Sequence, residues 1–158
     1  MNSIKDQKNL NKKKVLLRLD LNVPLKNGSI IDETRINKII PIIDFLIKEQ
    51  SKIIIISHVG RPKGTVITDL SLKPICENIE KKINRKIRLV KEDIFKLKKE
   101  DLFKDPNSQI VFLEIIRFYK PMREHDESKK RHHLHTGLQV QLNALKNYGR
   151  FFLTLRKI

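Results

Sequence analysis

Residues 53–57 read IIIIS, a run of four isoleucines followed by a serine. A strand with one face in water alternates apolar and polar residues, whereas a strand covered on both faces is continuously apolar. Isoleucine is β-branched and favours strands over helices. The run therefore predicts a buried strand of a parallel sheet, which must be covered on both faces.

Other segments fit strands and helices around this run. Residues 15–19, 86–90 and 109–113 predict short strands, and residues 35–50 and 71–84 predict helices. Strands that alternate with helices of this length are typical of an α/β fold. We expect a doubly wound, Rossmann-like parallel sheet with flanking helices.

Two local features interrupt the regular pattern. Asn27 and Gly28 can supply the two positive φ angles of a tight turn after the first strand. The helix from Arg35 to Gln50 contains Pro41, which must either kink it or lie in its first turn. Its apolar residues recur at helical spacing and are Ile36, Ile39, Ile40, Ile43, Leu46 and Ile47.

The composition limits the class of protein. A chain of 158 residues matches about one ordinary domain. Its 34 Lys and Arg against 18 Asp and Glu give a formal net charge of +16, which favours phosphorylated metabolites, nucleic acid or acidic membrane surfaces. Much of the excess is lysine in a chain also rich in isoleucine and asparagine, which AT-rich codons specify. The charge is therefore weak evidence of function.

Cysteine content and apolar runs indicate the compartment. The single cysteine, Cys76, excludes a disulfide within the chain, and the polar start has no apolar core of a signal peptide. The apolar runs are interrupted well before the ~20 residues that span a bilayer. We expect a cytoplasmic protein without a transmembrane segment or a membrane partner.

Three polar segments, RLDLNVP, SHVGRPKG and EIIRFYK, come at the ends of predicted strands. Ligands of doubly wound sheets bind beyond the carboxyl ends of the strands, so the three segments should converge on one edge. Asp20 and Asn22 lie two apart and would face the same way in an extended segment. A simple turn at the strand end explains these two residues as well.

The second segment offers groups for an anion. Gly60 permits close approach of the backbone, and His58 and Arg61 carry donors for an anionic oxygen. Solvated charges in a glycine-rich turn are the alternative. Arg35 and Arg117, taken singly, are each consistent with a surface arginine. Together the residues of this edge suit a small, phosphorylated and hydroxylated acid.

The ordered motifs RLDLNVPLKNG, IIDETRI, IIIISHVGRPKG, SLKP and FLEIIRFYK resemble the amino-terminal domain of the phosphoglycerate kinase family. The resemblance covers about residues 13–120. The family transfers a phosphoryl group between 1,3-bisphosphoglycerate and ADP, giving 3-phosphoglycerate and Mg-ATP, and its amino-terminal domain holds the triose acid. The resemblance therefore implies a small-molecule substrate, 3-phosphoglycerate or 1,3-bisphosphoglycerate.

The resemblance also implies a role for each candidate residue. Asp20 and Asn22 would bind the hydroxyl and carboxylate end of the triose, and His58, Arg61 and Arg117 would hold the distal phosphate. Arg35 would be the catalytic residue that stabilises the phosphoryl group in transit. The substrate-binding residues implied are Asp20, Leu21, Asn22, Arg35, His58, Val59, Gly60, Arg61 and Arg117.

The resemblance ends within the chain. The segment FLEIIRF has Ile115 where the family has asparagine, and no family motif follows residues 125–128. We interpret residues 121–158 as a tail foreign to the family, read out of frame or disordered, so that the sheet would be incomplete. The nucleotide-binding domain has no counterpart. We expect a partial kinase that binds no Mg-nucleotide cofactor and is inactive alone, unless a separate nucleotide-binding half completes it.

Other readings remain open. The histidines of HHLH, residues 132–135, have no cysteine or acidic ligand nearby, and we expect no metal site. A basic protein that reuses the scaffold to bind polyanions is the alternative function, which a strong salt dependence of binding would favour. We do not expect a nucleic-acid partner, because the positive charge is spread along the chain and forms no recognisable module.

Overall fold

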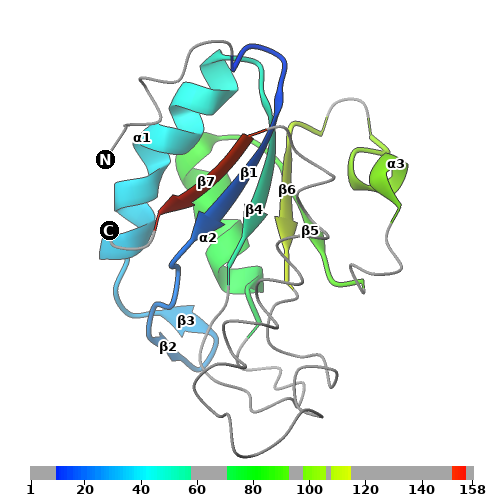
Figure 1. The fold of residues 1–158 in the computed structure, drawn as a ribbon. Helices are drawn as coiled ribbons and strands as arrows, with labels where there is room; N and C mark the ends of the chain where they lie inside the picture. Colours follow the sequence, from blue (N-terminus) through cyan, green and yellow to red (C-terminus); the bar gives the residue numbers. More distant parts are fainter. Residues whose placement is uncertain (1–9, 58–70, 93–97, 106–107, 115–150, 156–158) are drawn as a thin grey trace, which may run out of the picture.

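The computed structural model describes residues 10–57, 71–92, 98–105, 108–114 and 151–155. These form a parallel sheet with helices beside it (Figure 1). The sheet has the strand order β5-β6-β4-β1-β7. Its strands are β1 (Lys14–Leu19), β4 (Lys52–Ile56), β5 (Ile87–Val90), β6 (Ile110–Leu113) and β7 (Phe151–Leu155). The helices are α1 (Thr34–Lys48), α2 (Lys73–Ile83) and α3 (Lys99–Leu102), and β2 (Leu25–Lys26) pairs with β3 (Ser29–Ile30) in a hairpin. The predicted α/β fold with a parallel sheet is confirmed.

Strand β4 lies in the middle of the sheet, between β6 and β1. Its residues Ile53, Ile54, Ile55 and Ile56 are all 0% exposed, as the uninterrupted apolar run predicted. Ile53 and Ile55 belong to the core cluster that includes residues of α1 and α2. Because side chains alternate along a strand, Ile54 and Ile56 point to the opposite face, which is therefore buried as well.

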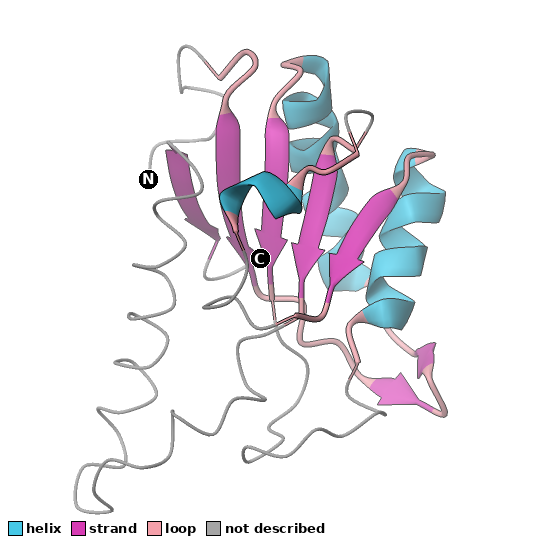
Figure 2. Ribbon diagram, turned by 90° about the vertical axis from the view of Figure 1, so that its right-hand side faces the viewer, coloured by secondary structure: helices cyan, strands magenta, loops and turns pink. Residues whose placement is uncertain are grey.

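The handedness of parallel connections explains where the helices lie. From β1 to β4, and from β4 to β5, the chain moves across the sheet in one direction, so right-handed crossovers put α1 and α2 on the same face. The return from β5 to β6 reverses direction, which puts α3 on the other face. Figure 2 shows the short α3 on the near side of the sheet and the two long helices on the far side. Arg88 of β5 reaches α3 by donating hydrogen bonds to the carbonyl oxygens of Asp101 and Leu102.

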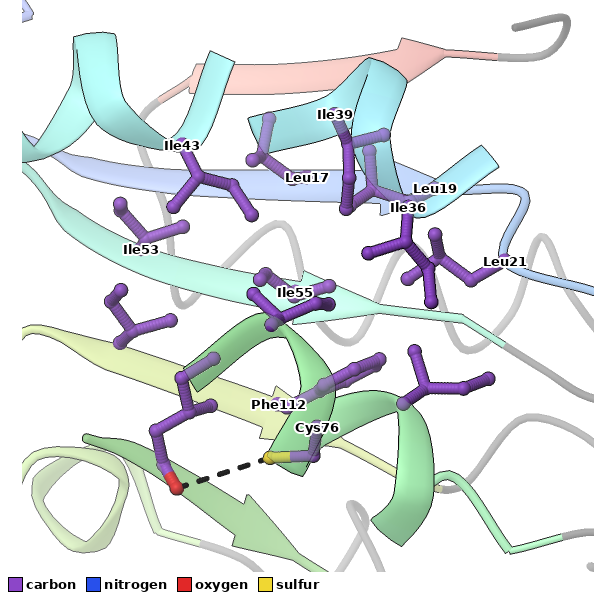
Figure 3. Packing of buried hydrophobic residues seen from close by; sticks show 14 of the residues in the cluster. Leu17, Leu19, Leu21, Ile36, Ile39, Ile43, Ile53, Ile55, Cys76 and Phe112 are labelled. Carbon is purple, nitrogen blue, oxygen red and sulfur yellow. Dashed lines mark hydrogen bonds between the residues drawn. The ribbon is translucent and has the colours of Figure 1, made fainter. Parts of the chain in front are cut away.

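The main core lies between the sheet and the pair α1 and α2 (Figure 3). Helix α1 buries residues spaced three and four apart: Ile36, Ile39, Ile43 and Leu46. Pro41 lies inside α1 on its exposed side, where its missing N–H removes one hydrogen bond without disturbing the buried face. Asn27 and Gly28, with φ of 50° and 73°, form the predicted tight turn between β2 and β3.

Strand β7 was not predicted. Residues 121–158 were expected to be out of frame or disordered, yet residues 151–155 pair in parallel with residues 15–19 of β1. The pairing fills the second edge of β1, whose backbone donors and acceptors would otherwise lack partners in the sheet. The boundary at residue 120 and the out-of-frame origin of the tail stay predictions.

The buried thiol of Cys76 gives a chemical test of this core. Cys76 lies in α2 with its Sγ 4.0 Å from the carbonyl oxygen of Ile87, and burial, together with nearby carboxylates, raises its pKa to about 12. We expect the native chain to react far more slowly with a thiol reagent at about pH 8 than the denatured chain, because the thiolate is the reactive form. Equal rates in the two states, followed by absorbance, would contradict the packing of α2 on the sheet.

Within the part of the chain that the structure describes, no helix has the length and apolar character needed to cross a bilayer.

Candidate functional site

The carboxyl ends of β1, β4 and β6 meet at one edge of the sheet, which we call the carboxyl edge. The residues that follow these strands are Asp20, Ser57 and Glu114. Arg18 of β1 pairs with Ile56 of β4, and the backbone N–H of Leu21 donates a hydrogen bond to Ser57 Oγ, so the segments that follow the two strands are in contact. The edge is where doubly wound sheets bind their ligands.

An ion pair between Asp20 and Arg35 lies at this edge. The Arg35 Nη1 and Asp20 Oδ1 atoms are 2.8 Å apart, and the same carboxylate oxygen accepts a hydrogen bond of 3.3 Å from the backbone N–H of Asn22. The two side chains are 41% and 40% exposed, so solvent screens the pair and it contributes only about 0–1 kcal/mol to stability. Its main effect is to orient the guanidinium group.

Arg35 lies in the first turn of α1, where the helix dipole disfavours a cation. The helix begins after Asp32, whose Oδ1 accepts the backbone N–H of Thr34 at 2.8 Å. Hydrogen bonds from Thr34 hold the pKa of Asp32 below its ordinary value. The amino end of α1 and Arg35 are both attractive to anions. An anionic ligand at the carboxyl edge would thus meet a favourable potential.

Glu33 fixes the amino end of α1 against α2. Its carboxylate accepts a hydrogen bond of 2.7 Å from Asn78 Nδ2 and lies 2.8 Å from Lys82 Nζ. The hydrogen bonds from Lys82 and then from Asn78 lower the pKa of Glu33. Because Glu33 is two residues from Arg35, these contacts also limit the movement of the first turn that carries Arg35.

The structure brings part of the predicted set together. Asp20 and Arg35 touch, and Asn22 is exposed beside them. Leu21, which the resemblance implied as a substrate-binding residue, is 0% exposed, and its backbone N–H donates a hydrogen bond to Ser57 Oγ. The predicted residues that lie outside the described part of the chain are His58, Val59, Gly60, Arg61 and Arg117.

Sequence analysis missed two buried polar residues at the same edge. Ser57 is 1% exposed, and its Oγ accepts a hydrogen bond of 3.1 Å from the backbone N–H of Leu21. Glu114, 7% exposed, accepts a hydrogen bond from the backbone N–H of Leu72. Ser57 ends the run that predicted a buried strand, but the sequence did not indicate the hydrogen bonds of Ser57 and Glu114 to distant backbone amides.

Within the described ranges, no three His, Cys, Asp or Glu side chains are grouped so that they could hold a metal ion. The predicted HHLH segment lies outside those ranges.

Comparison with known proteins decides the family. A family model described as phosphoglycerate kinase matches residues 4–148. The chain belongs to the phosphoglycerate kinase family. The match extends beyond residue 120, where the recognisable motifs end. The resemblance seen in the sequence is thus confirmed.

Comparison with curated phosphoglycerate kinases shows what share of a relative's length this chain covers. The chain is 38% identical over 117 residues to one from Wolbachia sp. subsp. Drosophila simulans (strain wRi), covering 74% of this chain and 29% of that protein. It is 42% identical over 106 residues to one from Orientia tsutsugamushi (strain Ikeda), covering 67% of this chain and 26% of that protein. The chain thus spans less than a third of these two relatives.

Solved phosphoglycerate kinases have the same fold. The structure from Coxiella burnetii superposes with a TM-score of 0.70 at 28% identity, covering 96% of this chain and 34% of that one. The enzyme from Pyrococcus horikoshii OT3 gives a TM-score of 0.73 at 22% identity, covering 98% and 36%, and supports the fold alone.

Proposed function

We propose that this chain is the triose-binding part of a phosphoglycerate kinase and binds 3-phosphoglycerate or 1,3-bisphosphoglycerate at its carboxyl edge. Family membership supports the substrate class. The observation that carries the proposal is the Arg35–Asp20 pair, which holds a guanidinium group in the first turn of α1 at the edge where sheets of this class bind ligands.

The described residues suit the groups of such a triose. The Asp20 carboxylate can accept a hydrogen bond from the substrate hydroxyl, and the Asn22 amide can donate to the substrate carboxylate. Arg35 can meet the phosphoryl group with a forked pair of donors. We assign the distal phosphate to His58, Arg61 and Arg117 on their place in the family motifs.

The proposed reaction is phosphoryl transfer between 1,3-bisphosphoglycerate and ADP. Such transfer depends on alignment of the reactants and on stabilisation of charge, with little covalent chemistry by the protein. In this scheme Asp20 orients Arg35, and Arg35 neutralises charge on the moving group. We assign the nucleotide and its magnesium ion to a part of the enzyme outside these 158 residues. A cytoplasmic location agrees with the proposed substrates, which are metabolites.

Calorimetric titration with 3-phosphoglycerate tests the binding proposal. 3-Phosphoglycerate lacks the moving phosphoryl group, so Arg35 would meet the substrate carboxylate that carries this group in 1,3-bisphosphoglycerate. We expect Arg35→Met to weaken binding by about tenfold to a hundredfold, because a charge-assisted hydrogen bond to an anion contributes about 1.5–3 kcal/mol. Lys38→Met is the matched control, since Lys38 is an exposed cation on the same helix. It should leave the affinity unchanged.

Equal losses in the two variants would contradict the proposed site, because the ligand would then respond only to net charge. A steep fall of affinity with salt, without any preference for 3-phosphoglycerate over inorganic phosphate, would favour the alternative of a polyanion-binding protein.

A further inference from the structure

Two buried serines flank β4, and each forms a hydrogen bond with a different part of the backbone. Ser51, which precedes the strand, is 0% exposed and donates a hydrogen bond of 2.8 Å from its Oγ to the carbonyl oxygen of Leu10. Ser57, which follows the strand, accepts the backbone N–H of Leu21. The first bond closes the amino edge of the sheet. The second bond crosses from β4 to the residue between Asp20 and Asn22.

Glu114, which follows β6, contacts two further elements at the carboxyl edge, β5 and α2. Its backbone N–H donates to the carbonyl oxygen of Val90 at 2.9 Å, and its carboxylate accepts the N–H of Leu72 at the start of α2. Its Oε2 atom lies 3.7 Å from the Nζ atom of Lys91, just after β5. The Glu114 side chain is 6% exposed, and a buried carboxylate is tolerated only where such partners replace water.

We propose that Ser57 and Glu114 are positioning residues that hold the backbone of the carboxyl edge in the arrangement needed to bind the triose. The proposal rests on the proposed function and adds to it two residues that do not touch the ligand. They act through two backbone amides, those of Leu21 and Leu72.

The hydrogen bond between Ser57 and the Leu21 amide restrains the side chains that are proposed to bind the triose. Fixing the amide of Leu21 restrains Asp20 and Asn22 on either side of it, and Asp20 in turn fixes Arg35 through their contact of 2.8 Å. In the sequence, Ser57 directly precedes His58, and Glu114 precedes Arg117 by three residues. Ser57 thus contacts the segment of residues 20–22 through the Leu21 amide and directly precedes His58, and Glu114 is close in sequence to Arg117.

The serine pair supplies a matched experiment. Ser57→Ala and Ser51→Ala each remove one buried hydroxyl with one hydrogen bond and should lower stability to a similar extent. We expect only Ser57→Ala to speed hydrogen exchange of the Leu21 amide, by at least about tenfold, and to weaken 3-phosphoglycerate binding by about threefold to tenfold. Both are measured by NMR on the folded chain, below the melting temperature of every variant.

The glutamate has its own control and rescue. Glu80 accepts a hydrogen bond of 2.7 Å from the N–H of Ile87 at the start of β5, on the amino edge. Glu114→Ala should speed exchange of the Leu72 amide and weaken binding, whereas Glu80→Ala should leave the affinity unchanged. Glu114→Gln, which keeps a carbonyl acceptor, should recover most of the loss. If Glu114→Ala does not fold, the glutamine variant and the serine pair decide.

The outcomes separate the two proposals. Faster exchange with weaker binding in Ser57→Ala, and neither in Ser51→Ala, supports the positioning role. Unchanged exchange at Leu21 in Ser57→Ala, or equal losses of affinity in both serine variants, overturns it. If the unaltered chain does not bind 3-phosphoglycerate, the proposed function fails. The claim that Ser57 and Glu114 serve triose binding then fails with it. In that case the hydrogen-exchange data still show whether the two residues hold the backbone of the carboxyl edge.

Discussion

Replacing Phe112 by alanine is expected to lower the free energy of unfolding by about 3–5 kcal/mol. Phe112 is 0% exposed in β6, opposite Ile55 of β4 and Leu89 of β5 in the register of the sheet. It is the largest fully buried side chain among the residues whose burial is described, and its loss removes contacts with the core beneath α1 and α2. Since domains are stable by about 5–15 kcal/mol, this is a large share of the total. Urea unfolding followed by circular dichroism measures it.

The control for this prediction is Ile31→Ala. Ile31 is also apolar but is 63% exposed, so its truncation should change stability by no more than about 0.5 kcal/mol. A loss below about 1 kcal/mol for Phe112→Ala, or equal losses in both variants, would show that β6 is not packed against the helices as described.

The second large effect concerns catalysis. We expect the 158-residue chain, supplied with 1,3-bisphosphoglycerate and Mg-ADP, to form ATP at least about 10⁵-fold more slowly than a full-length relative. Holding two reactants in line supplies an effective concentration of about 10⁵–10⁸ M, and one half of a site supplies none of it. Luminescence of the ATP formed gives the rate.

The full-length Wolbachia phosphoglycerate kinase is a suitable reference, because it is 38% identical to this chain over 117 residues. Turnover by the chain alone within about a hundredfold of the reference would refute the prediction and would show that these residues assemble a complete site. Loss of that turnover in Arg35→Met would then place the reaction at the carboxyl edge.

Much of the fold could be predicted because the local spacing of apolar residues matches the residues that are buried in the structure. The run Ile53–Ile56 predicted a strand covered on both faces, and the helical spacing of Ile36, Ile39 and Ile43 predicted a helix that differs from α1 by one or two residues at each end. The pair Asn27 and Gly28 predicted a tight turn because few other residues tolerate positive φ.

The elements that were missed depend on distant partners. Helix α3 has only four residues, too few for a periodic pattern. Strand β7 pairs only with β1 in the sheet, from the far end of the chain, and nothing local identified FFLTL as the partner of VLLRL.

The structure describes only part of the predicted site, and the contacts within that part were not predicted. The motifs placed Asp20 and Arg35 at one edge, yet each was considered as a ligand for substrate and not as a partner of the other. The roles of Ser57 and Glu114 depend on backbone amides that come from other parts of the chain, at Leu21 and Leu72. Sequence spacing does not report such contacts.

The pairing of β7 with β1 has a consequence for synthesis of the chain on the ribosome. Strand β1 emerges first, and β4 and α1 can pack on it soon afterwards, but its second edge is paired by residues 151–155. Until those residues have been translated, the nascent chain presents an open strand edge, which is a template for aggregation. The need for chaperones should therefore persist until residues 151–155 have been made, although most of the described core residues are made well before them.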